Sequence, residues 1–235
     1  MDAPQAAVAV DLVVLTIRER ELHVLVVERA NPPYRGRSAL PGGFVENDED
    51  LDAAASRELA EETGLDSSLL AIEQLRSYGA PGRDPRGRVV SVCYVALMPD
   101  LPLPVAGGDA EAARWNPVDE LLASPDRLAF DHHKLLADAV EHARSRLSYT
   151  TLATTFCAPE FTIAQLRDVY EIVWGTRLDP SNFHRKVTSS TDFVVPTGTR
   201  AVGAGGRPPM LYRAGRGTLL HPAILRDKPE GPDLR

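Results

Sequence analysis

The sequence predicts an α/β layered domain followed by a small α+β domain, and three observations lead to this expectation. Over residues 1–150, runs of β-branched residues alternate with stretches of good helix formers in the order β-β-α-β-α. Over residues 151–235, two capped helix signals precede two short β runs. The first part carries 15 Lys/Arg and 25 Asp/Glu, a net charge of −10, whereas the second carries 11 and 8, a net charge of +3. An acidic part followed by a basic part favours two domains with different partners.

The α/β domain is predicted to begin with a β-hairpin, because two β-rich runs within residues 7–30 flank the polar turn RERE. The segment NPPYRGR that follows is typical of a loop. Residues 49–63 are rich in Ala, Leu and Glu, which favour a helix, and Gly64 stands at its C-cap position. The run RVVSVCYVALMP predicts another strand, LPLPVAGGD a loop, and FDHHKLLADAVEHARSRL a last helix.

The small domain is predicted to hold two helices joined by a short turn, and then a β-hairpin. Thr162 is a favourable N-cap residue for the helix TIAQLRDVYEIVWG, which ends at Gly175. Asp179 at the N-cap and Pro180 at the first helical position predict the start of a second helix. The runs DFVVP and PMLYRA predict two short strands around a loop that contains glycine and arginine.

Composition excludes several classes of protein. With 43% apolar residues, the 235-residue chain can bury a sizeable core and does not resemble a disordered protein. Cys93 and Cys157 lie far apart without a CxxC motif, so we expect a reducing compartment and neither a disulfide scaffold nor a zinc site. The apolar run near the start is broken by Asp11 and lacks a basic flank, which favours a strand over a signal peptide. No run reaches the roughly 18 apolar residues of a membrane span. We therefore expect a cytoplasmic protein without a membrane partner.

Three glutamates crowd one face of the helix predicted over residues 49–63. At about 100° per residue, Glu58, Glu61 and Glu62 lie within a single arc of roughly 100°, and Arg57 can pair with Glu61 one turn on. Taken alone, such a cluster could be a solvated helix face. It could also hold a hard divalent cation, because Mg²⁺ takes oxygen ligands and shares them with substrate phosphates. The wider spacing favours the second interpretation.

The residues around this cluster resemble the Nudix box, Gx5Ex7REUxEExGU with U aliphatic, at every specified position. The resemblance implies an α/β Nudix sandwich, with helices on both faces of the sheet, that binds nucleoside diphosphates linked to another group. It also implies that Glu58 and Glu62 are metal ligands for Mg²⁺ or Mn²⁺, and that Glu61 is a ligand or helps activate water for attack on phosphorus. Arg57 would orient the carboxylates for catalysis. The matching residues are Gly43, Glu49, Arg57, Glu58, Leu59, Glu61, Glu62, Gly64 and Leu65.

Four residues near the box carry further expectations. Gly42 and Gly43 would allow the backbone to approach the ligand closely, because glycine has no side chain. Trp115 stands where the Nudix family has a Trp before a short helix, and we interpret it as a core residue. Glu111, which we expect in the loop before it, is interpreted as a solvated residue, with a second catalytic carboxylate as the alternative.

The basic part of the chain carries candidates for DNA binding. Between Arg177 and Arg216 there are seven Lys/Arg and two Asp/Glu. A helix-turn-helix followed by a β-hairpin wing would place its second helix in the major groove and its wing on the backbone. Arg and Asn are common readers of base edges, and Lys suits phosphates. A small basic surface patch is the alternative. The candidate DNA-binding residues are Asn182, His184, Arg185, Lys186, Arg200 and Arg207.

Three segments of the basic part resemble the winged helix-turn-helix domain of Nudix-related transcriptional regulators of NAD metabolism. In chain order they are FTIAQLRDVYEIVWG, LDPSNFHRK and GRPPMLYR. With the Nudix-like part, this resemblance covers nearly the whole chain. It implies a homodimeric repressor that binds palindromic operator DNA near NAD biosynthesis or salvage genes and responds to ADP-ribose or a related NAD metabolite. Many such regulators have degraded boxes, whereas this box is intact, so hydrolysis stays an open question.

Two functions follow from these patterns. The first is a ligand-responsive repressor with residues 1–150 as its Nudix-like effector-binding domain and residues 151–235 as its winged helix-turn-helix DNA-binding domain. The second is a Mg²⁺-dependent ADP-ribose pyrophosphatase whose tail packs or dimerises. A hydrolase of NADH or nucleoside sugars is a weaker third. The basic tail favours the repressor, and the complete box favours at least residual hydrolysis, which we expect to be slow or lost.

Overall fold

The computed structural model describes residues 5–108, 110–202 and 208–226. The chain divides into two compact units, Met1–His142 and Ala143–Arg235. Helix α3, His132–Tyr149, contributes its first part to the first unit and its last part to the second. The predicted boundary at residue 150 stays a prediction. Among the described residues, no helix is long and apolar enough to cross a membrane.

The first unit is built on a mixed seven-stranded sheet. Its main path runs β3-β2-β1-β6-β5, with β4 paired to β1 and β7 paired to β2. Strand β1 runs parallel to β6 and antiparallel to β2 and β4. The strands are β1 Ala7–Arg18, β2 Glu21–Arg29, β3 Ser38–Ala39, β4 Gly42–Phe44, β5 Glu73–Tyr78, β6 Val89–Leu97 and β7 Ala110–Pro117.

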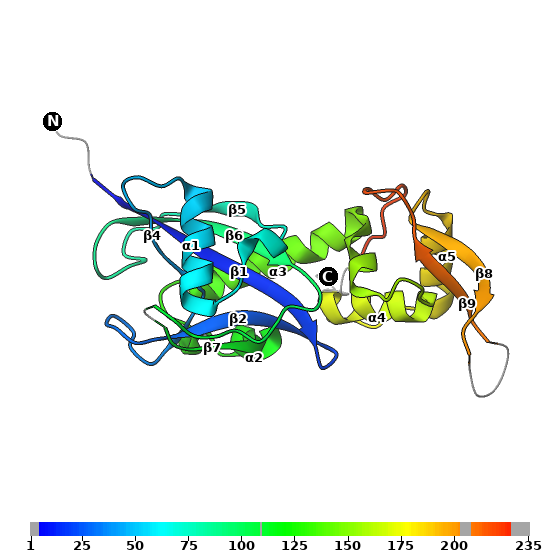
Figure 1. Ribbon diagram of the computed structural model, residues 1–235, viewed down its shortest axis with the longest axis horizontal. Coiled ribbons are helices and arrows are strands. Elements are labelled where there is room, and N and C mark those ends of the chain that lie inside the picture. Colours follow the sequence, from blue (N-terminus) through cyan, green and yellow to red (C-terminus); the bar gives the residue numbers. More distant parts are fainter. Residues whose placement is uncertain (1–4, 109, 203–207, 227–235) are drawn as a thin grey trace, which may run out of the picture. The chain divides into compact units, whose positions relative to one another are not determined.

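Helices cover the two faces of this sheet (Figure 1). Alternate residues of β1, such as Val10 and Leu12, pack in one core cluster with Leu59 of helix α1, because successive side chains of a strand point to opposite faces. Asp11, between them, faces the start of α3 instead, where it contacts His132. The predicted Nudix sandwich is confirmed. The remaining helices of this unit are α1 Leu51–Thr63, α2 Val118–Ala123 and the short 3-10 helices η1 Ser67–Leu69 and η2 Pro125–Arg127.

Local signals in the sequence predicted β1, β2, α1, β6 and α3, whereas β3, β4, β5 and β7 were not predicted. Glu19 and Arg20 form the predicted hairpin turn between β1 and β2 with φ of 50° and 65°, the left-handed conformation that two-residue hairpin loops use. Gly64 ends α1 with φ 68°. The loop expected around Glu111 is wrong, because Glu111 lies in β7. That segment is rich in alanine and has few β-branched residues, so its pairing with β2 has no local signal.

The second unit has the predicted order of helix, turn, helix and β-hairpin. The side chain of Thr162 accepts from the backbone of Gln165 in a capping box, and Gly175 ends the helix with φ 65°. Asp179 caps the second helix, with Pro180 in its first turn. These capping predictions are confirmed, as is the winged-helix fold. The elements are η3 Thr151–Phe156, α4 Ile163–Trp174, α5 Pro180–Ser189, β8 Val194–Arg200 and β9 Met210–Ala214.

Tyr170 of α4 lies at the centre of this unit. Its buried ring packs edge-on against Trp174 at 4.9 Å and against Phe183 of α5 at 5.1 Å between centroids. Its hydroxyl donates to the carbonyl of Leu147 at 3.0 Å, and the indole N–H of Trp174 donates to the carbonyl of Arg144 at 3.1 Å. The last part of α3 is thereby fixed to α4, and α4 is fixed to α5.

The turn between α4 and α5 is held by Glu171. Its carboxylate accepts from the backbone N–H of Leu178 at 2.9 Å and pairs with Arg177 at 3.0 Å and Arg167 at 3.2 Å. The Glu171 side chain is only 9% exposed, so these bonds lie mostly away from water. A single acceptor therefore sets where α5 begins relative to α4.

Replacing Glu171 with alanine should lower the free energy of unfolding of the second unit by about 1–3 kcal/mol, because the Leu178 amide loses its acceptor in a largely desolvated place. Glu171→Gln, which keeps a carbonyl acceptor, should cost less. The measurement is urea unfolding followed by Trp174 fluorescence in a Trp115→Phe background. Glu160→Ala, at an exposed position before α4, is the control. Equal stability of the Ala variant and the parent would remove Glu171 from this role.

Candidate functional site

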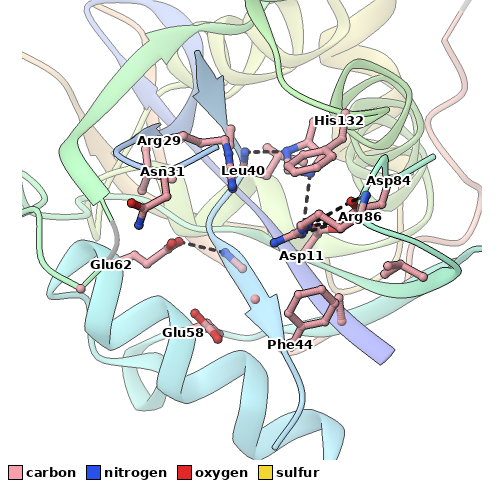
Figure 2. A pocket seen from close by; sticks show the side chains of 18 of the residues that line it. Asp11, Arg29, Asn31, Leu40, Phe44, Glu58, Glu62, Asp84, Arg86 and His132 are labelled. Carbon is pink, nitrogen blue, oxygen red and sulfur yellow. Dashed lines mark hydrogen bonds and ion pairs between the residues drawn. The ribbon is translucent and has the colours of Figure 1, made fainter. Parts of the chain in front are cut away.

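A cavity of about 390 Å³ opens in the first unit beside the N-terminal end of β4. Helix α1 contributes carboxylates to it, and the ends of strands and the loops between them contribute guanidinium groups and aromatic rings (Figure 2). The predicted site residues of the first unit, Gly42, Gly43, Arg57, Glu58, Glu61 and Glu62, all line this one cavity. The structure adds Asp11, Arg29, Asn31, Phe44, Arg83, Asp84, Arg86, Phe130 and His132 to its lining.

Two of the carboxylates, Glu58 and Glu62, are withdrawn from water. Burial raises the pKa of Glu62 to about 8, the hydrogen bond from Gly42 opposes this rise, and the neighbouring charge of Glu58 adds to it. Burial also raises the pKa of Glu58, although the hydrogen bond and charge of Arg57 act against it. Both side chains thus carry their negative charge at a cost, which a bound cation would reduce.

The absence of side chains at Gly42 and Gly43 lets their backbone lie close to neighbouring groups of the site. The amide of Gly42 donates to Glu62 Oε2 at 2.9 Å. A Cβ placed on Gly43 would lie 2.1 Å from Glu58 Oε1, and one on Gly42 would lie 2.2 Å from the carbonyl oxygen of Val10. Gly42 also has φ 153°, which side-chain-bearing residues rarely adopt. The predicted close approach of backbone at these positions is therefore a steric property of the site.

Arg57 holds the carboxylates in register. Its Nη2 and Nε bond the two oxygens of Glu49 at 2.6 and 3.0 Å, in the bidentate geometry that arginine favours. Its Nη1 reaches Glu58 at 2.8 Å and Glu61 at 3.3 Å, which confirms the predicted Arg57–Glu61 pair. Its hydrogen bonds also lower the pKa of Glu49. The orienting role expected for Arg57 fits these contacts.

The donor set suits a hard cation. Carboxylate oxygens are ligands that Mg²⁺ prefers, and Glu58 and Glu62 point into the cavity from one side of α1. Within the residues described, no three His, Cys, Asp or Glu side chains are already arranged as a ligand set. Glu61, with a side chain 54% exposed, is engaged by Arg57. A cation would therefore be held by Glu58 and Glu62 with Glu61 nearby, and it would supply charge neutralisation for bound phosphate.

Behind the carboxylates lies a buried polar network that the sequence did not reveal. Asp11 accepts from Ser91 and contacts Arg83 Nη2 at 3.4 Å and His132 Nε2 at 3.3 Å. Burial alone would raise the pKa of Asp11, but His132, Ser91 and Arg83 together lower it to about 2. Arg83 also binds Asp131 at 2.6 Å. An aspartate inside an apolar run was the one available signal, since charged residues are seldom buried without partners.

The outer part of the cavity combines arginine with aromatic rings. The guanidinium of Arg86 lies 4.6 Å from the ring centroid of Phe44 and 5.4 Å from that of Phe130, and Asp84 binds it at 2.7 Å. The guanidinium of Arg29 lies 4.9 Å from the centroid of the Phe130 ring. These side chains come from β2, the end of β4, the β5–β6 loop and the segment before α3, so only the fold brings them together.

Two other residues singled out in the sequence lie away from this cavity. Trp115 packs against the core cluster under α1, and its indole N–H donates to the carbonyl of Pro102 at 3.0 Å. The guanidinium of Arg18 lies over the Trp115 ring, 5.1 Å from its centroid. Glu111 is exposed on β7 and is not part of the cavity lining.

The candidate DNA-binding residues of the second unit divide by exposure. Phe183 and Val187 bury one face of α5, which leaves His184 and Arg185 exposed on the other. Asn182 and Lys186 are half-buried at its sides, and Asn182 Oδ1 accepts from Arg185 Nη2 at 2.7 Å. Arg200, at the end of β8, is exposed and donates to the carbonyl of Pro208 at 2.7 Å. Arg207 lies outside the described residues.

Comparison with known proteins agrees with this division. A family model described as NUDIX domain matches residues 6–139, and one described as NrtR DNA-binding winged helix domain matches residues 154–214. The ADPR responsive transcriptional repressor NtrR of Acinetobacter baylyi is 37% identical over 214 residues, which cover 90% of this chain and 83% of that protein. The chain belongs to the NrtR family of Nudix-domain regulators.

Solved structures of the NrtR family extend the likeness to the arrangement of the backbone. Shewanella oneidensis NrtR complexed with a 27mer DNA has a TM-score of 0.69 and 34% sequence identity, covering 88% of this chain and 93% of that one. The Nudix domain of Shewanella oneidensis NrtR complexed with ADP ribose has a TM-score of 0.55 and 37% identity, covering 60% of this chain and 90% of that one. Within the NrtR family, both a DNA complex and an ADP-ribose complex are therefore known for a similar protein.

The steric role of Gly43 leads to a prediction. In Gly43→Ala the new Cβ should push the Glu58 carboxylate out of place, so the affinity for Mn²⁺ should fall by about tenfold or more, a loss of the size seen when groups that orient metal ligands are removed. Titration calorimetry with Mn²⁺ measures this. Gly79→Ala is the matched control, because a Cβ there meets only ordinary contacts at 3.5 Å or more. Equal Mn²⁺ affinity of the two variants would contradict the steric argument.

Proposed function

We propose that this protein is an ADP-ribose-responsive transcriptional repressor that binds operator DNA through α4, α5 and the β8–β9 wing. The observation that carries the proposal is the joining of a complete Nudix cavity to a winged helix in one chain, both matched by NrtR-family proteins over most of the length. A hydrolase alone would have no need for a second, basic unit with a capped recognition helix. NAD biosynthesis or salvage genes are the proposed targets, since ADP-ribose derives from NAD.

The cavity offers complementary chemistry for such an effector. Glu58 and Glu62 would hold Mg²⁺ or Mn²⁺, which neutralises the diphosphate when bound. Arg29 and Arg86 lie on the same cavity and supply positive charge for phosphate oxygens, while Phe44 offers an aromatic surface that is 39% exposed. Gly42 and Gly43 keep the backbone close to these groups. The Nudix cavity thus has a charged part and an aromatic part, as a nucleoside diphosphate does.

The second unit offers the complementary chemistry for DNA. Helix α5 presents His184 and Arg185 outward from its buried face, which suits a recognition helix that enters the major groove. Lys186 at its side and Arg200 on the wing suit phosphate contacts. A repressor that reads a palindrome would act as a homodimer, with half-sites about one helical turn, roughly 10 bp, or a multiple apart. The acidic first unit repels DNA, which favours it as the place of the dimer contacts.

Arg185 is the proposed reader of a base edge on α5. Arg185→Ala should weaken specific operator binding by about 1–3 kcal/mol and relax the preference at one base pair, whereas Lys186→Ala should weaken binding to all sequences and reduce the salt dependence. Fluorescence anisotropy with operator and scrambled duplexes at several salt concentrations separates the two effects. Arg127→Ala, an exposed arginine of the first unit, is the charge-matched control. Unchanged operator binding after removal of both α5 side chains would exclude α5 as the recognition helix.

The effector response is tested on DNA upstream of the protein's own gene and of NAD genes. We expect full-length protein to shift such DNA in a gel, and ADP-ribose with Mg²⁺ to release it, because a repressor of NAD genes should yield to a product of NAD turnover. Sedimentation of the same samples should show a dimer. Binding of none of these duplexes, or binding that ADP-ribose leaves unchanged, would argue against the proposal.

The intact Nudix box favours one alternative, Mg²⁺-dependent hydrolysis of ADP-ribose. The Arg57 fork orders Glu49, Glu58 and Glu61 as a working site would require. We expect turnover to be slow or absent, because rapid hydrolysis would destroy the signal that a repressor senses. The assay is AMP release from ADP-ribose with Mg²⁺, beside a Glu61→Gln, Glu62→Gln double variant. Rapid turnover that the double variant loses, without any effect of ADP-ribose on DNA binding, would favour the pyrophosphatase.

A further inference from the structure

The short segment Leu40–Gly42 is bonded at both ends to functional parts of the first unit. At one end, the Gly42 amide donates to Glu62 Oε2 at 2.9 Å. At the other, the Leu40 amide donates to Nδ1 of His132 at 2.9 Å (Figure 2). Between them, the Pro41 carbonyl accepts from Leu12 at 2.8 Å. A carboxylate of the cavity and the first residue of α3 are therefore connected through three consecutive residues.

His132 is fixed on both of its ring nitrogens. Because Nδ1 accepts from the Leu40 amide, Nε2 carries the proton and faces Asp11 Oδ1 at 3.3 Å. Asp11 is in turn bound by Ser91 and Arg83. The His132 side chain is 5% exposed, so neither contact has water as an easy replacement. A displacement of Leu40 must consequently be followed by the His132 ring or break a buried hydrogen bond.

Helix α3 leads from His132 into the second unit without a break. Its last part is held to α4 through the carbonyls of Arg144 and Leu147, which accept from Trp174 and Tyr170. Tyr170 packs on Phe183 of the proposed recognition helix. The chain of contacts from the cavity to α5 is therefore continuous within each unit and covalent between them.

We propose that His132 is a positioning residue that couples occupancy of the cavity to the first turn of α3 through its hydrogen bond with the Leu40 amide. The inference rests on the proposed function. A cation that binds Glu62 competes with the Gly42 amide for that carboxylate, and a diphosphate competes with Glu62 for the amide. Either change frees the Leu40–Gly42 segment to move. The Leu40 amide then shifts against His132, and α3 moves with it. A ligand changes DNA affinity only through such a difference between two arrangements.

The test compares two substitutions of His132, each of which keeps one of its two polar contacts. Asn places an oxygen near the position of Nδ1, so His132→Asn keeps an acceptor for the Leu40 amide and loses the contact with Asp11. Gln places a polar atom near the position of Nε2, so His132→Gln keeps a donor to Asp11 and loses the Leu40 acceptor. His133→Gln is the control, since His133 Nε2 lies 3.1 Å from the carbonyl of Leu122, apart from the Leu40 and Asp11 contacts of His132. The full chain is used throughout.

The readout is the coupling factor, the ratio of operator Kd with saturating ADP-ribose and Mg²⁺ to operator Kd without them. Saturation is set for each variant from its own titration, so changes in ligand affinity do not enter. We expect a factor of about 5–150 in the parent, the usual range of allosteric coupling. His132→Asn and His133→Gln should keep most of it, whereas His132→Gln should bring it to within about twofold of one.

Different outcomes contradict the role of His132 and the proposed repressor function. If ADP-ribose does not change the operator Kd of the parent protein, the proposed function itself is wrong. A responsive parent with full coupling in His132→Gln, or equal loss in both His132 variants, would overturn the role of the Leu40 bond alone. If a variant does not fold, hydrogen exchange of the parent decides. Exchange at the Leu40 amide and the first turn of α3 should change on adding ADP-ribose, and identical exchange would overturn the inference.

Discussion

The site of this protein depends on the close approach of two buried carboxylates to the backbone of two glycines. Glu58 has room because Gly43 lacks a side chain, and Glu62 accepts from the Gly42 amide, which lies close to the β1 backbone. Burial raises the pKa of both side chains. Arg57 balances part of that charge from one side, but it serves Glu49, Glu58 and Glu61 rather than Glu62. Glu62 is left with a backbone amide as its nearest donor. A cation bound there would lower the cost of that charge, and β4, which carries Gly42, would respond to a change at Glu62.

The sequence was informative wherever the physics is local. The box glutamates share one helix, so their spacing alone places them on one face, and the caps at Thr162, Gly175 and Asp179 lie next to the helices that they end. The hairpin at Glu19 and Arg20 has the same property, because a two-residue turn is set by its neighbours. Fold class and helix boundaries were predictable for this reason.

What the sequence could not show is assembled from distant segments. Asp11 contacts Ser91, Arg83 and His132 only in the folded sheet, and the residues next to Asp11 in the sequence do not indicate these partners. Arg86 is a further case, since Phe44 at the end of β4 and Phe130 before α3 lie beside it from separate parts of the chain. Strand β7 was missed because three of its eight residues are alanine, none is β-branched, and it is held by its pairing with β2. These contacts and this strand depend on residues far apart in the sequence, so motif spacing and local propensity do not predict them.

The path of α3 also has a consequence for anyone who wishes to study the parts separately. The carbonyls of Arg144 and Leu147 complete the interior of the winged helix, although by sequence they belong to a helix that begins beside the Nudix cavity. A fragment begun at residue 151 would strip two acceptors from Tyr170 and Trp174 and uncover the side of α4 they protect. A fragment begun at Ala143 keeps both. The place to cut the chain for expression is therefore inside a helix, and not in the loop that follows it.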